Sequence, residues 1–491
     1  MKTPGKLNVC YVTSECVPFV KTGGLADVSG ALPYALSGLN CHIKIFIPFY
    51  KSINAFEFKL DEVKEVHKVP VILNDKTYYF RLWYGKLYDS LAEVYFIDCP
   101  EFFDRDSVYT NDKDEDLRFI LFQNAVLISL RKINWFPDVI HCNDWQTSLI
   151  PYYLKTRFYS NNPYSNISTL LTIHNIAYQG IFPKENVLNA NIRMEDFMPF
   201  SPFEYYEQFC FLKTGIHYSD FLNTVSPTYA EETKTSEIGS GLQDFLDKRS
   251  DEYTGILNGI DTNIWNPISD NLIPSNYDFR TIGKKFKNKI ELLELVNLPY
   301  DENKIVIGLI SRFAWQKGIE LIMPIIDELM KLNLQLIVLG TGDEMYQKFF
   351  RDAQSNYPDK ISVDIGYNNE LAHLITAGSD MFLMPSRYEP CGLNQMYSLN
   401  YGTIPIVRKT GGLADTVKDY NENSSEGNGF SFIEFTPEKL LETVKRSLTV
   451  FSDKEKRMKI IQKGMSEDFS WSNSAEKYFN LYKMLAKEKT V

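Results

Sequence analysis

The heptapeptide KTGGLAD occurs twice in this chain, at residues 21–27 and again at residues 409–415. Each copy follows a short apolar run and opens an amphipathic stretch, which predicts a turn between a β-strand and an α-helix. Adjacent glycines allow close approach to the backbone, and the N–H groups at a helix N-terminus favour negative charge. A single glycine-rich turn is weak evidence for an anion site, and an ordinary connection is the alternative. The duplication suggests two similar α/β halves that face one another across a shared ligand.

Length and composition predict two globular domains. A chain of 491 residues exceeds what one hydrophobic core usually supports. Hydrophobic residues make up 44% and aromatic residues 14%, which excludes disorder as the main state. The formal net charge of -11 argues against a nucleic-acid groove, because phosphate binding needs concentrated Lys and Arg. An anionic small ligand is still compatible with this charge, since local charge can oppose the global sign.

The cysteines and the hydropathy pattern predict a cytoplasmic protein. The seven cysteines are odd in number and show no CxxC spacing, which is typical of reduced thiols. The first residues lack an apolar stretch of signal-peptide length, and no window reaches the ~20 apolar residues of a membrane span. We therefore expect no membrane contact.

Apolar runs alternate with helical patterns along both halves of the chain. The runs, which we expect to form strands, are residues 7–13, 43–47, 78–83, 94–97, 139–142, 170–173, 222–225, 305–310, 334–339, 361–365, 381–384 and 404–407. The helical patterns are residues 117–130, 145–158, 320–332, 454–465 and 475–486. Near-continuous apolar runs mark strands that are buried on both faces, and their alternation with helices indicates doubly wound parallel sheets.

Two segments depart from this alternation. Residues 68–98 alternate polar and apolar side chains more strictly, which predicts a hairpin-like excursion. Residues 262–277 are polar, rich in Pro and Asn, and without clear periodicity. We interpret the second segment as the crossing between the domains.

Polar residues and glycines follow many of the apolar runs. In doubly wound sheets, ligands bind beyond the carboxyl ends of the strands. The motifs at these places include HCNDWQT from residue 141, HNIAYQG from 174, SRFAWQKG from 311 and PSRYEPCGLNQ from 385. A fold alone does not require this density of Gly, Asn, Arg, Lys and carboxylate. It predicts a site that is lined from both halves.

Arg312 and Lys317 are candidates for binding an anionic group. Arg offers a planar fork and Lys a compact charge, a pair suited to a diphosphate leaving group, whereas the alternative is a solvated surface. Together with the Gly23 and Gly24 amides they could take the place of a divalent metal. The six His are scattered, and the acidic pairs at 104/106 and 112/114 fit surface charge better than a metal site. We expect neither a metal nor a cofactor.

Glu389 precedes a glycine that would start a helix at about Leu393. Sugar hydroxyls could donate to its carboxylate and accept from the amides of Gly392, Leu393 and Asn394, although a plain helix cap is the alternative. Asp144 and His174 also follow predicted strands, and either could meet the reacting centre. A single His is more often a core residue.

Tyr367 follows another predicted strand and precedes two asparagines. Its ring could stack on a purine base. The alternative is an ordinary core or surface tyrosine.

Taken together, these motifs closely resemble those of the bacterial glycogen synthase and plant starch synthase family, the family 5 glycosyltransferases. The match spans almost the full chain and includes KTGGLADVSGALP, LTIHNIAYQG, GILNGID and DFSW besides the motifs above. The resemblance implies the GT-B architecture, in which two Rossmann-like doubly wound domains face one another across a deep cleft. It implies an acceptor-side domain at 1–256, a nucleotide-sugar domain at 257–468, and a C-terminal helix at 469–491 that returns to the first domain.

The resemblance also implies the reaction. Glucose would be transferred from ADP-glucose to the non-reducing 4-hydroxyl of an α-1,4-glucan such as glycogen or starch, with retention and without metal. Asp144 and His174 would lie near the glucose, Arg312 and Lys317 would stabilise the diphosphate, and Glu389 would hold the 3- and 4-hydroxyls. The implied donor-binding residues are Lys21, Gly23, Gly24, Asn175, Asn258, Tyr367, Cys391, Gly392, Leu393 and Asn394.

Three alternatives remain at the level of sequence. One is another retaining GT-B transferase with UDP-glucose or a different acceptor; Tyr397 argues against it, because many such enzymes have a second glutamate there. The others are a non-catalytic glucan-binding scaffold and a nicotinamide dehydrogenase. The absence of GxGxxG after the first apolar run argues against the dehydrogenase.

Within the family, we expect residues 21–27 to touch the donor, and residues 409–415 to lie at the rim and support closure.

Overall fold

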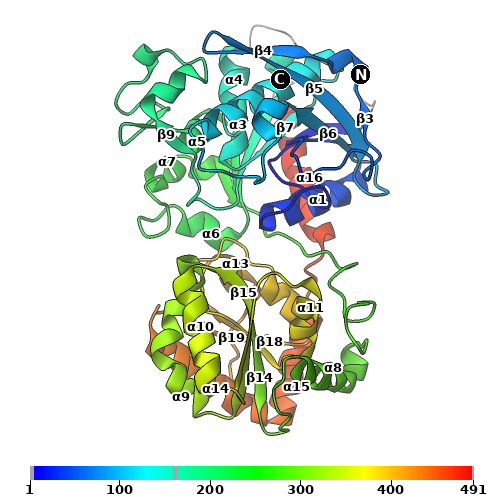
Figure 1. Cartoon of the computed structure of the whole chain (residues 1–491), viewed down its shortest axis with the longest axis vertical. Coiled ribbons are helices and arrows are strands. Elements are labelled where there is room, and N and C mark those ends of the chain that lie inside the picture. Colours follow the sequence, from blue (N-terminus) through cyan, green and yellow to red (C-terminus); the bar gives the residue numbers. More distant parts are fainter. Residues whose placement is uncertain (1–4, 159–162, 489–491) are drawn as a thin grey trace. The chain divides into compact units, whose positions relative to one another are not determined.

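The computed structural model describes residues 5–158 and 163–488, which form two compact units (Figure 1). Unit 1 contains the described residues of Met1–Val225, Ala230–Gly259 and Trp471–Val491. Unit 2 contains Ser226–Tyr229 and Ile260–Ser470. Each unit has its own mainly parallel sheet, as the alternation of apolar runs and helical patterns predicts.

Unit 1 is built on a sheet in which the strand order is β13-β12-β8-β7-β1-β2-β6-β5-β3, with β4 paired to β5. Its strands are β1 (Leu7–Val12), β2 (Cys41–Pro48), β3 (Asp61–Glu62), β4 (Val69–Leu73), β5 (Lys76–Lys86), β6 (Glu93–Asp98), β7 (Val139–Asn143), β8 (Ser168–Ile173), β12 (Phe221–Thr224) and β13 (Tyr253–Gly255). The strands from β13 to β6 pair in parallel. Strand β5 pairs antiparallel with β4 and β6, so the predicted hairpin-like excursion is confirmed.

The helices of unit 1 cover this sheet. They are α1 (Gly24–Ser37), α2 (Pro100–Phe103), α3 (Glu115–Lys132), α4 (Ile150–Thr156), α5 (Phe211–Tyr218), α7 (Gln243–Asp247) and α16 (Trp471–Glu488), and α6 (Pro227–Glu232) spans the boundary of the units. A small sheet of β9 (Ile181–Pro183), β10 (Glu204–Tyr205) and β11 (Gln208–Cys210) was not predicted. The single helix predicted at 145–158 is also wrong. A 3-10 turn, Trp145–Thr147, precedes α4, which starts just before Pro151, since proline is tolerated only in a first turn.

Helix α16 follows unit 2 in the sequence and packs in unit 1, beside α1 (Figure 1). The buried hydroxyl of Tyr482 lies 2.7 Å from Nδ1 of His141 on β7. Asn223 on β12 donates to the Tyr478 hydroxyl over 2.8 Å. The predicted return of the C-terminal helix to the first domain is therefore confirmed.

Unit 2 has a six-stranded parallel sheet of order β16-β15-β14-β17-β18-β19. Its strands are β14 (Ile305–Phe313), β15 (Leu334–Gly342), β16 (Ile361–Ile365), β17 (Met381–Met384), β18 (Ile404–Arg408) and β19 (Phe430–Phe432). Side chains on alternate faces enter two separate hydrophobic clusters, with Ile307 and Leu309 in one and Val306 in the other. Burial on both faces explains why these strands read as continuous apolar runs.

Helices flank both faces of this sheet (Figure 1). They are α8 (Lys285–Leu295), α9 (Ile326–Met330), α10 (Glu344–Asn356), α11 (Asn369–Gly378), α12 (Asn394–Asn400), α13 (Gly411–Thr416), α14 (Pro437–Ser452) and α15 (Lys454–Met465). The continuous helix predicted at 320–332 is wrong. Two 3-10 turns, Ile319–Leu321 and Met323–Ile325, precede the short α9, because Pro324 has no N–H to continue an α-helical ladder.

Residues 262–277 are a packed part of unit 2, since the boundary between the units lies at Gly259–Ile260. The Trp265 ring stacks on His373 and on Tyr397, with centroid distances of 3.8 and 4.0 Å. Tyr277 is buried and donates to the Tyr401 carbonyl over 2.8 Å. Their interpretation as the crossing between the domains is wrong, because the aromatic residues in this polar segment anchor it within unit 2.

The two KTGGLAD copies both form a turn that enters a helix, but their surroundings differ. Gly23 is extended, with φ of -153°, and an added Cβ at Gly23 or Gly24 would meet no atom within 4 Å. A Cβ at Gly411 or Gly412 would overlap the backbone of Glu389 and Cys391. The Gly412 N–H donates to the Glu389 carbonyl over 3.1 Å. Close backbone packing therefore requires glycine only in the second copy.

We expect the same substitution to have different effects in the two copies. Gly24→Ala should keep or slightly raise the free energy of unfolding, because alanine is the better helix former by roughly 0.5–1 kcal/mol. Gly412→Ala should lower it by about 1–3 kcal/mol, because the new methyl group displaces the Glu389–Cys391 backbone. Urea unfolding of both variants measures this difference. Equal losses in the two variants would contradict the packing described.

Candidate active site

In unit 2, the Glu389 carboxylate and the Lys317 ammonium form a nearly buried ion pair. Lys317 ends a 3-10 turn that follows β14, and Glu389 lies in the loop after β17. Strands β14 and β17 are neighbours in a parallel sheet, so their carboxyl ends bring the two residues together. Lys317 Nζ lies 2.6 Å from Glu389 Oε2, which also accepts from Ser386 over 3.0 Å. The Glu389 side chain is 7% exposed and the Lys317 side chain 21%.

The loop that carries Glu389 is held by a glycine turn and by the side chain of Gln395. Gly392 adopts the left-handed region, with φ of +70°. The Gln395 side-chain amide donates to the Cys391 and Gly392 carbonyls over 3.0 Å each. Helix α12 starts at Asn394, and no side chain caps it. The alternative of Glu389 as a plain helix cap is therefore wrong, since its carboxylate binds Lys317 instead.

The other residues predicted in unit 2 lie on nearby strand ends or in the same loop. Arg312 is the second-last residue of β14, just before Phe313, and it is exposed. Asn394 fastens the Glu389 loop to β14 through its side-chain amide, which donates to the Ile310 carbonyl over 2.9 Å. Tyr367 follows β16 and is 80% exposed, so its ring face is accessible to a planar group.

In unit 1, Asp144 has an unusual backbone at the end of β7. Its φ is +57° and its ψ -174°, a conformation that costs a non-glycine residue on the order of 1–3 kcal/mol and is concentrated at functional sites. Its Oδ1 accepts from the His174 N–H over 2.7 Å. Although the residue is partly accessible, the surrounding protein removes the hydration of the carboxyl and raises its pKa to about 7, and the charge of Glu15 adds to this effect.

His174 follows β8 and lies next to Asp144. Its Nε2 is 2.9 Å from Asn143 Oδ1, and the Asn143 amide nitrogen donates to the Val12 carbonyl, so Oδ1 is the acceptor. Burial lowers the pKa of His174 to about 3, so the ring is neutral at neutral pH. The ring proton is then on Nε2, and Nδ1 is an acceptor suited to a hydroxyl group.

The first KTGGLAD copy contributes Lys21 and the two glycines. Lys21 Nζ lies 2.7 Å from Asp27 at the exposed start of α1. The Gly23 N–H donates to the carboxylate of Glu15 over 3.1 Å. Sequence reasoning did not identify Glu15. The signal available was a single carboxylate inside the apolar stretch between β1 and the turn.

The two asparagines predicted for donor binding differ in their contacts. Asn175 Oδ1 accepts from the Ala177 N–H over 3.1 Å and so closes a local turn. Asn258 is 5% exposed, and its buried Oδ1 has no hydrogen-bond partner among the described residues. An unsatisfied buried carbonyl is rare, and a bound ligand or water is its usual partner.

Three of the four acidic residues at 104/106 and 112/114 form ion pairs. Asp106 lies 2.9 Å from Lys51, and Asp112 and Asp114 both bind Arg105. Among residues 5–158 and 163–488, no group of three or more His, Cys, Asp or Glu is placed to hold a metal ion.

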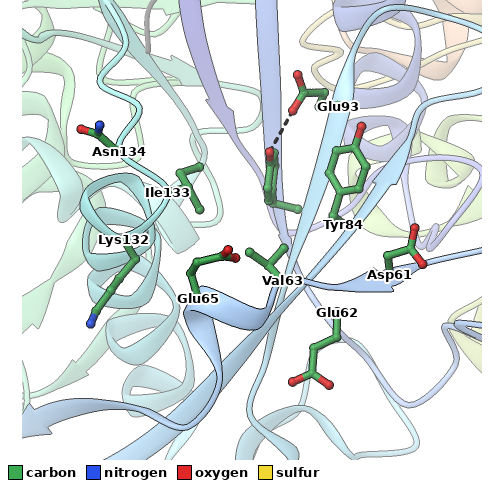
Figure 2. Close-up of a pocket in the computed structure, with 10 residues that line it drawn as sticks. Asp61, Glu62, Val63, Glu65, Tyr84, Glu93, Lys132, Ile133 and Asn134 are labelled. Carbon is green, nitrogen blue, oxygen red and sulfur yellow. Dashed lines mark hydrogen bonds between the residues drawn. The ribbon is translucent and has the colours of Figure 1, made fainter.

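A hollow of about 460 Å³ opens beside β3, β5 and β6 (Figure 2). Its lining is Asp61, Glu62, Val63, Glu65, Tyr84, Glu93, Tyr95, Lys132, Ile133 and Asn134. Glu93 is bound by Lys44 over 2.6 Å. The lining includes none of the residues predicted to act in the reaction.

None of the described helices combines the length and the apolar character needed to cross a membrane.

The raised pKa of Asp144 predicts how stability depends on pH. A carboxyl whose folded pKa of about 7 exceeds its ordinary 3.8 stabilises the fold fully below pH 3.8, and this contribution is lost progressively as the pH rises to about 7. Asp144→Asn keeps the oxygen that accepts from His174 and has no charge to bury. The variant should therefore exceed the Tm of the original protein by a wider margin at pH 8 than at pH 5, and this margin should grow by roughly 3 °C or more, since 1 kcal/mol corresponds to about 2–4 °C.

Differential scanning calorimetry at the two pH values measures this gap. The lowered pKa of His174 affects both proteins alike and cancels in the comparison. A gap in Tm that is the same at pH 5 and pH 8 would contradict the raised pKa of Asp144.

Comparisons with known proteins identify the family of this chain. Residues 8–248 match the family described as starch synthase catalytic domain, and residues 294–466 match glycosyl transferases group 1. The glycogen synthase of Clostridium novyi is 43% identical over 477 residues, which are 97% of this chain and 98% of the relative. That of Thermotoga maritima is 43% identical over 484 residues, 97% of this chain and 98% of the relative.

Solved structures show the same fold. The catalytic domain of starch synthase IV from Arabidopsis thaliana, bound to ADP and acarbose, superposes with a TM-score of 0.90 at 31% identity, covering 98% of this chain and 100% of that one. A sucrose-phosphate synthase from Thermosynechococcus elongatus, at 16% identity and a TM-score of 0.62, covers 98% of this chain and 99% of that one and shares the fold alone. The two Rossmann-like units thus form the GT-B fold. Identity above 40% over nearly the whole chain shows that it belongs to the bacterial glycogen synthase and plant starch synthase family.

Proposed function

We propose that this protein is a glycogen synthase that transfers glucose from ADP-glucose to the non-reducing 4-hydroxyl of an α-1,4-glucan, with retention. The observation that carries the proposal is the Lys317–Glu389 pair at the strand ends of unit 2, which places a cation and a hydroxyl acceptor 2.6 Å apart. The family relation supports it, and the Arabidopsis relative bound to ADP supports an adenine nucleotide as donor. The seven buried thiols support a cytoplasmic location.

Lys317 and Arg312 stabilise the departing diphosphate in this proposal. Breaking the bond between glucose and phosphate builds negative charge on the leaving group, and preorganised cations lower the energy of that transition state most. Lys317 is bound to Glu389, so an incoming diphosphate shares or replaces this partner. Glu389 then accepts hydrogen bonds from the 3- and 4-hydroxyls of glucose. The amides of Cys391, Gly392, Leu393 and Asn394 donate to the same hydroxyls.

Asp144 and His174 bind the transferred glucose. The neutral His174 ring accepts from the 6-hydroxyl through Nδ1, since its Nε2 already donates to Asn143. Burial raises the pKa of Asp144 to about 7, so its uncharged form is accessible at neutral pH and can donate to a sugar hydroxyl. In line with the family relation, we propose that retention proceeds by attack on the face from which the diphosphate departs, with the leaving phosphate taking the acceptor's proton.

The remaining donor contacts follow from exposure and position. Tyr367 stacks on the base. Lys21 and the Gly24 N–H bind phosphate or sugar, and Gly23 contributes only close approach of its backbone, because its N–H donates to Glu15. Asn175 and Asn258 bind the donor through their side-chain amides.

An assay of glucan growth tests the proposed function. The purified protein is incubated with glycogen and either ADP-[14C]glucose or UDP-[14C]glucose, with EDTA present, and label in precipitated glucan is counted. We expect incorporation from ADP-glucose to exceed that from UDP-glucose and to survive EDTA. Release of ADP without glucan growth would overturn the synthase function. A preference for UDP-glucose would overturn the assignment of ADP-glucose as the donor.

Lys317→Ala should lower kcat by about 10²–10³-fold, because it removes a cation from the leaving group in the transition state. ADP affinity, measured by calorimetry, should change far less. Lys348→Ala is the matched control, since Lys348 is an exposed lysine of unit 2 paired with Asp352. Unchanged turnover in Lys317→Ala would remove this residue from the leaving-group role.

Lys21→Ala should harm turnover well beyond Lys409→Ala, although the two lysines share the same heptapeptide. The turn after Lys21 borders open space, whereas the turn after Lys409 packs against the Glu389 loop. Steady-state kinetics of both variants measure the difference. Equal losses would mean that the two copies have equivalent roles.

A further inference from the structure

We propose that Glu15 is a positioning residue that holds the turn of Lys21, Gly23 and Gly24 in its binding conformation. This inference rests on the proposed function, in which that turn contacts the donor. Glu15 lies between β1 and the turn, and it is 3% exposed.

The Glu15 carboxylate accepts four hydrogen bonds. The backbone N–H groups of Thr22 and Gly23 donate to Oε2 over 2.5 and 3.1 Å. The hydroxyls of Thr22 and Tyr109 donate to Oε1 over 2.7 and 2.6 Å. Each carboxylate oxygen is thus bound by two donors, and both turn amides that precede α1 point at Glu15.

These four partners are neutral, which makes the burial of this charge costly. A buried carboxylate normally has a cationic partner, and hydrogen bonds to neutral donors offset its lost hydration only in part. Neighbouring Asp144 adds to the cost, because the charge of Glu15 contributes to the raised pKa of that carboxyl. A buried carboxylate with neutral partners adds little to the free energy of unfolding. Its four hydrogen bonds do, however, fix the geometry of the turn.

The turn itself offers little other support. Gly23 is the N-cap of α1 and has no side chain that could cap the helix. Added Cβ atoms at Gly23 and Gly24 would meet nothing within 4 Å, so neither residue packs against a neighbouring segment. The hydrogen bonds from the Thr22 and Gly23 N–H groups to Glu15 therefore hold the turn where side-chain packing does not.

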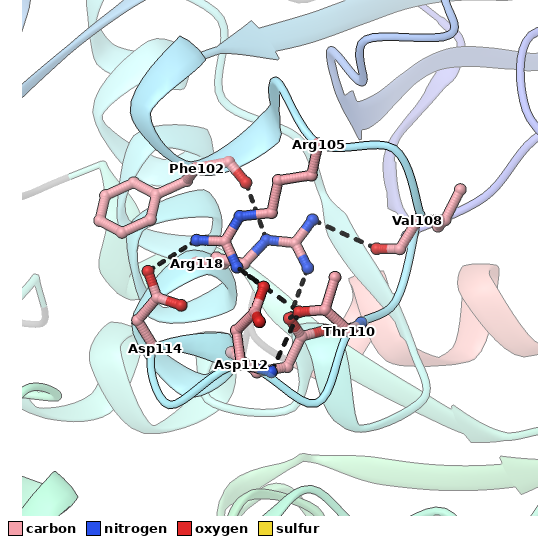
Figure 3. Close-up of polar contacts among 8 residues, drawn as sticks. Phe102, Arg105, Val108, Thr110, Asp112, Asp114 and Arg118 are labelled. Carbon is pink, nitrogen blue, oxygen red and sulfur yellow. Dashed lines mark hydrogen bonds and ion pairs between the residues drawn. The ribbon is translucent and has the colours of Figure 1, made fainter.

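Glu15 is in turn fixed by a well-anchored loop, residues 104–114. Tyr109 projects from this loop to Glu15, and both of its neighbours in sequence are bound: Arg118 donates to the Val108 carbonyl over 3.2 Å, and Thr110 donates to Glu115. Figure 3 shows Arg105 and Arg118 inside the loop. Arg105 binds Asp112 and Asp114, and the fully buried Arg118 binds the Phe102 carbonyl over 2.8 Å. The ion pairs thus hold the loop in place, and the loop carries Tyr109. Tyr109 binds Glu15, and Glu15 binds the turn.

Glu15→Gln tests the proposal, because the side-chain shape is kept while one oxygen becomes an NH₂ group that faces donors. Hydrogen–deuterium exchange of the Thr22 and Gly23 amides should speed up, and kcat/KM for ADP-glucose should fall on the order of 10²-fold, as a displacement of about 1 Å can cause. Thr22→Val, which removes one donor from an exposed position and should fold normally, is the second variant and should show both effects more weakly.

Glu93→Gln is the matched control, since Glu93 is a carboxylate of unit 1 bound by Lys44 and His42 away from the turn. It should leave exchange at the turn and kcat/KM unchanged, even if it lowers Tm. Normal exchange at Thr22 and Gly23 in Glu15→Gln, or normal kcat/KM with faster exchange, would overturn the positioning role.

The experiments distinguish failure of the proposed synthase function from failure of the positioning role of Glu15. If the original protein makes no glucan from ADP-glucose, the synthase function fails. The positioning claim is then decided by exchange at the turn and by the calorimetric affinity for ADP, which should fall in Glu15→Gln and not in Glu93→Gln.

Discussion

The backbone contact between Gly411–Gly412 and the Glu389 loop is the constraint on which the unit 2 site depends. A side chain at either glycine would overlap this loop, so the second KTGGLAD copy is the surface on which the loop rests. The loop presents Glu389 to Lys317, and neighbouring parallel strands bring the two residues within 2.6 Å. Lys317 and Glu389 both follow strand ends, but the distance between their charged groups depends on how the Glu389 loop packs on Gly411 and Gly412. The chemistry of unit 2 thus follows from close backbone packing as much as from its charged groups.

Electrostatics differ between the two units. In unit 2 Lys317 and Glu389 form an ion pair, whereas in unit 1 Asp144, Glu15 and His174 are held by neutral donors and acceptors. Burial then moves the pKa of Asp144 up to about 7 and that of His174 down to about 3. Both groups are suited to uncharged hydroxyls at neutral pH. In the proposed function, Asp144 and His174 of unit 1 therefore bind sugar hydroxyls, whereas the ion pair of unit 2 serves both the diphosphate, through Lys317, and the sugar, through Glu389.

The sequence predicted most of the parallel strands of both units, with β13 and β19 missed, and the strand ends that carry Asp144, His174, Lys317 and Glu389. Apolar runs report burial on two faces directly, so strands were easier to predict than the helix that Pro324 breaks. The duplicated heptapeptide predicted two similar turns but not their different surroundings, because these depend on residues distant in sequence. Glu15 was not predicted, since its partner Tyr109 is 94 residues away. Motif spacing finds residues that touch a ligand more readily than residues that hold those residues in place.

A crystal structure of the protein with bound ADP tests the central claim most directly. The account predicts a diphosphate oxygen within hydrogen-bond distance of Lys317 Nζ, with the hydrogen bond from Gly412 N–H to the Glu389 carbonyl retained. ADP bound with its diphosphate away from Lys317 would contradict the account. So would a Glu389 loop that leaves the second KTGGLAD turn when the nucleotide binds.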